Sequence, residues 1–162
     1  MSSVSIDTEN LGKALGRVAS GVYVVTLTEK SERDGMLATF IGQVAFEPPM
    51  VSIAVKRERP ILPKLPAGAK FAVNVLGKKN TEIFKHFAKP FAEGVDRFAG
   101  LRVEDKPTGP VLSECVSYIG CRVISQAEAG DHIVVLAEVI EGAMLDGEQE
   151  PMVHLRKNGF QY

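Results

Sequence analysis

The chain has 162 residues, of which 45% are hydrophobic and 24% are charged, and its formal net charge is −1. This length and balance are typical of a soluble globular protein, so we expect residues 1–162 to form a single domain. The near-zero net charge gives no whole-molecule reason to expect binding to nucleic acid or to an anionic membrane. No apolar run approaches the roughly 20 residues that cross a bilayer, and the polar start "MSSVSIDTEN" lacks the layout of a secretory signal, so we expect a cytoplasmic protein.

The first elements are predicted from the spacing of apolar residues. Residues 9–19 place apolar side chains at helical intervals, which predicts a helix. The β-branched and aromatic run 22–28 then predicts a strand. The charged segment 29–35 follows as a hairpin loop, with Asp34-Gly35 as its turn signal.

The middle of the chain predicts further strands. They are expected at residues 36–46, 50–56 and 70–77. Gly42, inside the first of them, is expected to mark a bulge or the close approach of another backbone or of a ligand. Pro48-Pro49 ends that strand, and residues 60–68 predict a proline-rich connection with one helical turn.

The second half begins with a short amphipathic helix that Asn80 or Thr81 caps and Pro90 ends, and its inner face carries Ile83, Phe84 and Phe87. Two long strands and a short last element are expected at residues 114–129, 132–145 and 151–157. Tight turns rather than long helices separate successive strands, which disfavours a doubly wound parallel sheet. The pattern therefore favours a mainly β fold with a few short helices, built as a closed or nearly closed antiparallel barrel.

The spacing of cysteine and histidine matches no metal motif. Cys115 and Cys121 are six positions apart, so two reduced and buried thiols are expected, with a disulfide as the alternative. The three histidines are far apart and lack H-E-x-x-H spacing, so no metal site is expected. The sequence also lacks a dinucleotide-binding G-x-G-x-x-G turn, a Walker A motif and a G-x-S-x-G elbow.

Four local patterns are candidates for a ligand site, and each has an ordinary structural alternative. Ala38-Thr39 combines a small side chain with a hydroxyl, which lets a planar ligand approach the backbone, although threonine is also common in strands. Lys56, Arg57 and Arg59 follow a strand and suit a phosphate, although such runs also form solvated loops.

The other two patterns lie later in the chain. "GDH" (130–132) places a histidine at a turn, either as a hydrogen-bonding group beside a ligand or as a surface residue. "DRF" (96–98) places a cation beside an aromatic ring, either against a nucleotide or flavin or as a helix end tucked onto the core. Residues 51–102 carry eleven Lys and Arg against four acids, which indicates a site for a small anion or a solvated basic face.

In this order, several segments together resemble the flavin reductase-like family. They are "ASGVYVVT" (19–26), "GMLATFIGQVAFEPPMVSIAVKR" (35–57), "KFAVNVL" (70–76), "DRFAG" (96–100), "CRV" (121–123) and "GDHIVVLAEV" (130–139). The resemblance runs from about Leu11 to Tyr162. Two further segments, "KHFAKPFAEGVDRFAG" (85–100) and "VHLRKNGFQY" (153–162), are similar to the C-terminal flavin reductase domain of cyanobacterial and chloroplast flavodiiron proteins.

The resemblance implies an FMN-binding split β-barrel, antiparallel and of Greek-key type. It also implies NAD(P)H-linked reduction of flavin by a homodimer, with FMN or else FAD as cofactor and with electrons passed to a flavin, to oxygen or to an acceptor protein. No side chain is then required as a nucleophile, because the flavin carries the redox chemistry and the protein positions the nicotinamide. A chain of 162 residues leaves no room for a di-iron or flavodoxin domain, so di-iron chemistry is not expected.

Position by position, the resemblance also implies the site residues. The flavin ring would be lined by Met36, Leu37, Ala38, Thr39, Phe40 and Gln43. Lys56, Arg57 and Arg59 would neutralise the phosphate. Arg97 and Phe98 would cover the flavin from one side, and His132 would be the catalytic residue beside the ring, where the nicotinamide stacks.

One departure from the family pattern bears on function. Leu37-Ala38-Thr39-Phe40 stands where many members have Thr-Ala-Ser-Ser, and the loss of hydroxyls predicts weaker hydrogen bonding to flavin unless Phe40 compensates by stacking or packing. Two other functions stay open. One is a non-catalytic FMN-binding electron-relay module that serves a separate protein, and the other is a scaffold for a different ligand, such as haem or a metal.

Overall fold

The computed structural model describes residues 6–162, and strands make up most of its regular structure. The helical elements are α1 (Thr8–Gly16), the 3₁₀ turn η1 (Leu62–Lys64) and α2 (Thr81–Ala88). The strands are β1 (Ser20–Gly21), β2 (Tyr23–Glu29), β3 (Glu32–Ala38), β4 (Ile41–Phe46), β5 (Pro49–Lys56), β6 (Lys70–Val75), β7 (Val103–Lys106), β8 (Gly109–Leu112), β9 (Ser117–Ala129), β10 (His132–Met144) and β11 (Val153–His154). Every strand pair is antiparallel, which confirms the predicted fold class.

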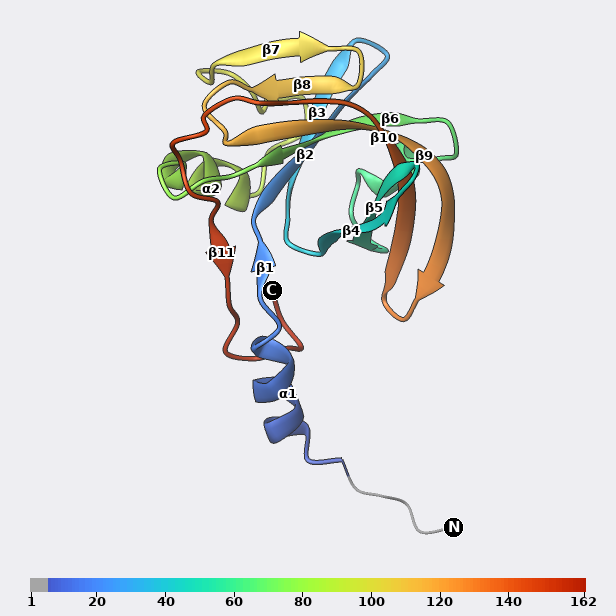
Figure 1. Ribbon diagram of the computed structural model, residues 1–162, viewed down its shortest axis with the longest axis vertical. Coiled ribbons are helices and arrows are strands. Elements are labelled where there is room, and N and C mark those ends of the chain that lie inside the picture. The colour runs from blue at the N-terminus through green and yellow to red at the C-terminus, as the bar shows by residue number, and fades with distance from the viewer. Residues whose placement is uncertain (1–5) are drawn as a thin grey trace.

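The main sheet has seven strands in the order β3-β2-β6-β9-β10-β5-β4. Its two edge strands, β3 and β4, are separated in the chain by only Thr39 and Phe40. The sheet must therefore curl until its edges meet at these two residues, and the result is a barrel that is split between β3 and β4. Figure 1 shows the curvature in the long β9–β10 hairpin, which bends around β4 and β5.

Apolar side chains fill the barrel and a second layer under α2. Val25 and Phe71, both fully buried, belong to the cluster inside the barrel. Val24 points to the opposite face of β2 and packs in a cluster with Ile83 and Phe87 of α2. The strand is thus buried on both faces, and the prediction of an amphipathic helix with Ile83 and Phe87 on its inner side is confirmed.

The hairpin between β2 and β3 turns at a different place from the one predicted. Its turn residues are Lys30 and Ser31, whose φ angles of 50° and 68° give the left-handed backbone of a tight turn. The prediction of a turn at Asp34-Gly35 was wrong. Asp34 lies inside β3, and its buried carboxylate pairs with two cations that lie elsewhere in the fold.

The prediction of one continuous strand at residues 36–46 was also wrong. The segment is two strands with different partners, β3 against β2 and β4 against β5. Thr39 and Phe40 interrupt the pairing because the chain crosses there from one edge of the sheet to the other. A bulge lies between Gln43 and Ala45, next to Gly42 as expected, and no described atom lies within 4 Å of a side chain built on that glycine.

The long strands near 114–129 and 132–145 and the single helical turn within 60–68 are confirmed. The β7–β8 hairpin and the short β1–β11 ladder were not predicted. β7 reads "VEDK" and pairs only with β8, so it has neither the alternation nor the apolar content by which a strand is recognised. Cys115 and Cys121 are free and buried, which matches the expectation of reduced thiols.

Figure 1 shows α1 standing below the barrel, linked to it by β1, which pairs with β11. The helix packs closely on the segment 156–160. Arg156 donates its backbone N–H to Gly16 O at 3.1 Å, and a side chain on Gly16 would approach Arg156 O to 2.2 Å, so only glycine permits this contact. In the part of the chain that the structure describes, no helix has the length and apolar character needed to cross a membrane.

Candidate functional site

A cavity of about 520 Å³ lies at the seam of the barrel, where β3 ends and the chain crosses to β4. One wall is the continuous segment 35–40. A second wall comes from the end of β5 and the loop after it, in residues 54–56 and 59–61. The third comes from residues 87–91, at the end of α2, together with Arg97. The volume lies within the range of cofactor and drug-sized ligand pockets, about 300–1,000 Å³.

The first wall offers hydrogen-bonding groups that the chain itself does not satisfy. The Thr39 hydroxyl is buried and has no hydrogen-bond partner among residues 6–162. Such a group costs about 1–3 kcal/mol when it stays unpaired, so native proteins rarely keep one without a reason. β3 is an edge strand, so the backbone edge that faces away from β2 has no strand partner. A planar polar ligand placed here would meet a hydroxyl and an open backbone edge.

The second wall supplies positive charge. Lys56 and Arg59 line the cavity, and Lys89 lines it from the wall opposite. Within the described chain, none of these three side chains forms an ion pair, whereas most of the other basic side chains near them do. Unpaired ammonium and guanidinium groups beside a cavity are suited to holding an anion such as a phosphate.

Arg57, the third predicted phosphate residue, does not line the cavity. Its Nε donates to Gly130 O at 3.0 Å, and its Nη2 lies 3.6 Å from the Glu128 carboxylate. Both partners belong to the β9–β10 hairpin, so the guanidinium is turned onto that hairpin and its charge is already partly balanced there. The sequence placed Arg57 in the right segment, but its side chain points elsewhere.

Arg97 lines the cavity, and its side chain is firmly held there. Its Nη1 donates to Asp34 Oδ1 and to Gly35 O, both at 2.8 Å, and its guanidinium carbon lies 5.2 Å from the centre of the Phe91 ring. The second oxygen of Asp34 accepts from Lys64 Nζ at 2.9 Å. Asp34 is only 5% exposed, so a nearly buried carboxylate ties β3, η1 and the loop after α2 together.

Phe98 and Gln43 are not brought to the cavity. Phe98 is 2% exposed and packs in the core with its ring centre 5.6 Å from that of Phe87, so it cannot cover a ligand. The alternative interpretation, a helix end tucked onto the core, is right about the packing of Phe98, but the residue lies in a turn well after α2 ends and not at a helix end. Gln43 lies on the exposed strand β4, next to the bulge, and donates to Ala45 O at 3.2 Å.

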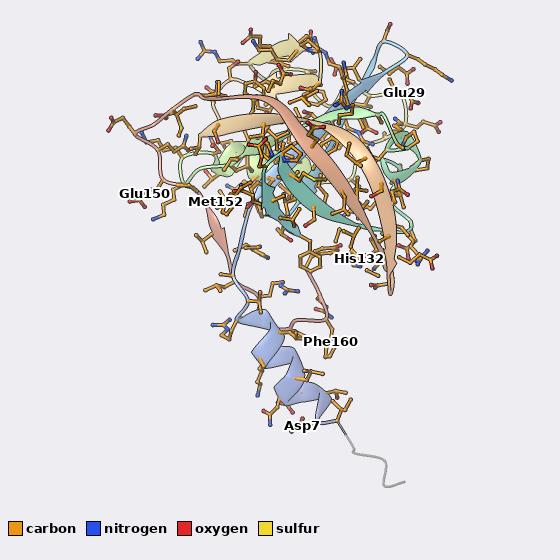
Figure 2. All side chains as sticks on the ribbon, turned by 45° about the vertical axis from the view of Figure 1, so that its right-hand side comes forward. Asp7, Glu29, His132, Glu150, Met152 and Phe160 are labelled. Atoms are coloured by element: carbon orange, nitrogen blue, oxygen red, sulfur yellow. The ribbon has the colours of Figure 1, made fainter. Side chains whose placement is uncertain are left out.

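His132 lies beside the cavity but does not line it. Its Nδ1 is 2.7 Å from Asp131 Oδ1, its Nε2 is hydrogen-bonded to the Tyr162 hydroxyl, and its ring centre is 5.5 Å from that of Phe40. The hydrogen bond to His132 holds the pKa of Asp131 below its usual range, and burial raises the pKa of Tyr162. Figure 2 shows His132 at the end of the barrel that faces α1, where Phe160 also lies.

The cavity thus brings together most of the predicted residues from three separate segments. They are Met36, Leu37, Ala38, Thr39, Phe40, Lys56, Arg59 and Arg97. The sequence did not single out Asp34, Lys89, Phe91 or Tyr162 as site residues, although they pair with or line the same walls. Lys89 and Phe91 flank the proline that ends α2, and their only signals were the basic stretch 51–102, which includes Lys89, and the resemblance segment 85–100. Tyr162 stood inside the resemblance segment 153–162, which was its only signal.

A sequence profile of the family described as "Flavin reductase like domain" matches residues 15–161. Diflavin flavoprotein A 1 of Synechocystis sp. is 36% identical over 160 residues, which cover 98% of this chain and 28% of that protein. The solved structure of the NADH:FAD oxidoreductase SgcE6 of Streptomyces globisporus matches with a TM-score of 0.84 and 28% identity, over 96% of this chain and 93% of that one. A structure of SgcE6 in complex with NAD and FAD fragments gives a TM-score of 0.81 at 27% identity, over 95% and 93% of the two chains.

The chain therefore spans only about 28% of the length of this curated relative, so the activity of the whole diflavin protein does not transfer with the match. The family profile, in contrast, covers nearly all of the barrel and each wall of the cavity. The antiparallel split barrel, the profile match and the similarity to cyanobacterial diflavin flavoproteins agree, and the chain belongs to the flavin reductase like domain family.

Proposed function

We propose that this protein is an FMN-binding oxidoreductase that takes a hydride from NADH or NADPH and passes the electrons to a flavin, to oxygen or to an acceptor protein. The observation that carries the proposal is the buried Thr39 hydroxyl, which has no partner in the described chain and lies beside the open edge of β3. The pyrimidine edge of a flavin carries both donors and acceptors of hydrogen bonds, so it can supply the missing partner. Family membership and the name of SgcE6, which includes NADH and FAD, support the same function.

The residues present also fit the phosphate of FMN. Lys56 and Arg59 enter the cavity from the end of β5, and Lys89 enters from the opposite wall. A phosphate monoester carries nearly two negative charges at neutral pH, which these unpaired cations can balance. We therefore assign the phosphate contact to Lys56 and Arg59 rather than to Arg57, because Arg57 is paired with the β9–β10 hairpin.

The chain's own residues bind, orient and shield in this proposal. Thr39 and the β3 edge fix the polar edge of the ring, and the apolar wall around Phe91 excludes water from the cavity. Arg97, held by Asp34, keeps the loop after α2 against β3. His132, oriented by Asp131, is the proposed catalytic residue next to the nicotinamide. When bound, the flavin supplies the redox chemistry by accepting the hydride.

The direct test is spectroscopic. Purified protein is incubated with FMN, freed of excess ligand and examined for the visible bands of bound flavin. The bound sample is then titrated with NADH and with NADPH in the absence of oxygen. Bleaching of the flavin bands by either nucleotide is the expected result. Protein that binds no FMN and oxidises neither nucleotide in its presence would rule the proposal out.

The phosphate assignment has a matched pair of variants two positions apart. Arg59→Ala removes a cavity-lining cation and should weaken FMN binding about 10- to 100-fold, the cost of one charged hydrogen bond. It should leave binding of riboflavin, which lacks the phosphate, nearly unchanged. Arg57→Ala is the control, because its partners are Gly130 and Glu128, and it should change FMN affinity little. Equal losses of FMN and riboflavin affinity in Arg59→Ala would contradict the assignment.

A second candidate function is an electron-relay module that binds FMN but does not itself oxidise the nucleotide. It is supported by the relative of which this chain spans about 28%, since such a domain works there within a longer protein. Tight FMN binding with negligible reduction by either nucleotide, together with rapid reduction by a separate reduced flavoprotein, would favour this function over the first.

We also propose that the protein forms a homodimer, as the family resemblance implies. Exposed apolar side chains lie between α1 and β1, on β11 and in the segment after β11, among them Val18, Val153, Leu155 and Phe160, and a second copy would cover such a surface. Sedimentation equilibrium measures the mass directly, and a monomer at micromolar concentration would contradict this proposal.

A further inference from the structure

Tyr162 reaches the proposed flavin cavity from a part of the chain far from its other walls. Its side chain lines the cavity, and its ring centre lies 5.4 Å from that of Phe40, which belongs to the wall where the planar ring is proposed to bind. About half of the residue is exposed, so its phenol covers the cavity from the solvent side. The predicted ring contacts that do line the cavity come from β3 and the Thr39-Phe40 linker.

Two hydrogen bonds in series fix the direction of this side chain. His132 Nδ1 lies 2.7 Å from Asp131 Oδ1, and because a carboxylate oxygen only accepts, the proton of this hydrogen bond is on Nδ1. Nε2 is hydrogen-bonded to the Tyr162 hydroxyl. His132 does not line the cavity itself, so its contact with a ligand there runs through Tyr162 or requires the tyrosine to move.

Three side chains pack against Phe40 in this arrangement. The ring centres of Tyr162 and His132 lie 5.4 Å and 5.5 Å from the centre of the Phe40 ring, and the Arg156 guanidinium carbon lies 5.1 Å from it. The aromatic residue that departs from the family pattern is therefore a fixed support for Tyr162 at the mouth of the cavity.

We propose that Tyr162 is a ligand-contact residue of the flavin site, that its phenol lies against the bound ring, and that the His132–Asp131 pair is what positions it. This inference rests on the proposed function, because it needs a flavin in the cavity. It assigns a direct contact to a residue outside the segment 36–43 that was expected to line the ring. It also gives His132 a positioning role in addition to the catalytic one.

The composition of the chain makes this contact measurable. A phenol or indole that touches a flavin ring quenches its fluorescence by donating an electron to the excited ring, and a phenylalanine side chain does not. The chain has no tryptophan and three tyrosines. Tyr23 and Tyr118 do not line this cavity, so Tyr162 is the only side chain of the quenching type that does so in the described chain.

The experiment compares the fluorescence yield and decay of FMN bound to the wild-type protein, to Tyr162→Phe and to the control Tyr118→Phe. Each measurement is made at protein excess, so that the signal comes from bound FMN. Tyr162→Phe should raise the yield several-fold and remove the fastest decay component, whereas Tyr118→Phe should match the wild type. An unchanged yield and decay in Tyr162→Phe, with FMN bound, would overturn the contact.

The positioning part is tested with His132→Asn and Asp131→Asn. Both variants keep Tyr162 but weaken the hydrogen bonds that orient it, so bound FMN should show a longer, more heterogeneous decay than in the wild type. A decay identical to that of the wild type in both variants would overturn the positioning role. Asp131, His132 and Tyr162 are at least partly exposed, and Tyr118→Phe removes only a hydroxyl from a buried ring, so the variants should fold, and circular dichroism checks that they do.

The two proposals fail in different ways. Equilibrium dialysis of FMN tests the site itself. If no FMN binds to the wild type, the proposed function fails and no fluorescence of a bound ligand exists to compare. If FMN binds but its fluorescence does not respond to Tyr162→Phe, the proposed function stands and only the contact is refuted.

Discussion

Replacing Thr39 by valine should stabilise the ligand-free protein and weaken FMN binding. Valine keeps the branched shape of threonine and exchanges only the hydroxyl for a methyl group. Without ligand, the hydroxyl is buried and has no partner among the residues that the structure describes, so its removal loses no hydrogen bond seen there. The free energy of unfolding should therefore be unchanged or rise by up to about 1–3 kcal/mol, the cost of a buried unsatisfied hydroxyl.

With FMN bound, the sign reverses. The hydroxyl then has a partner, and a typical hydrogen bond contributes about 0.5–1.5 kcal/mol, so Thr39→Val should raise the dissociation constant of FMN about 2- to 10-fold. Urea unfolding without ligand gives the first quantity, and titration of the visible flavin bands gives the second. Opposite signs from one substitution are hard to produce by general damage to the fold.

Thr26 provides a matched control. It is also a fully buried strand threonine, but its hydroxyl donates to Pro110 O at 2.6 Å and accepts from Asn74 Nδ2 at 3.1 Å. Thr26→Val should therefore lower the free energy of unfolding by about 1–3 kcal/mol. The reasoning about Thr39 is refuted if Thr39→Val destabilises the ligand-free protein as much as Thr26→Val does, or if FMN affinity does not change.

Three further predictions concern the surroundings of the site. Gly16→Ala gains up to about 1 kcal/mol of helix propensity but forces a methyl group to 2.2 Å from Arg156 O. Urea unfolding should therefore show a net loss of about 1–3 kcal/mol in the free energy of unfolding, and an unchanged value would contradict the close packing. Asp34→Asn leaves Lys64 and Arg97 without this charged partner, so the free energy of unfolding in the same assay should fall by about 1–3 kcal/mol. The loop after α2 should also be cleaved faster by a protease, and an unchanged cleavage rate would argue against the role of Asp34 in holding that loop. Burial raises the pKa of the thiols of Cys115 and Cys121 from 9.0 to about 12. Because the unfolded chain then loses these protons at lower pH than the folded chain, the free energy of unfolding should fall between pH 9 and pH 12, and replacing both cysteines by alanine should remove this part of the pH dependence.

Local chemistry was sufficient to predict much of this fold. The long strands β9 and β10, the strand β5 and the amphipathic helix α2 were recognised because their period and apolar content are properties of the segment itself. The same holds for the candidate segments 36–40 and 56–59, whose hydroxyl, small and basic residues are adjacent in the chain. Where an element depends on its neighbours, prediction failed. Residues 36–46 read as one strand because the sequence does not show that Thr39 and Phe40 carry the chain between two sheet edges.

The sequence by itself determined the class of fold and the segments that supply the walls of the cavity. Only the tertiary structure decided which side chains meet. Lys56 and Arg59 face the cavity, whereas Arg57 is turned onto the β9–β10 hairpin by Gly130 O. Phe98 is buried in the core, while Tyr162 lies against Phe40.

The physical reason is that these partnerships are between residues far apart in the chain. Arg97 and Asp34 are 63 positions apart in sequence, but Arg97 Nη1 lies 2.8 Å from Asp34 Oδ1. Tyr162 is hydrogen-bonded to His132, which lies 30 positions earlier in the chain. Periodicity and composition describe only the covalent neighbourhood of a residue. A hydrogen bond or ion pair across the fold depends on how the whole sheet curls and closes, and in this protein that closure at Thr39 and Phe40 creates the site.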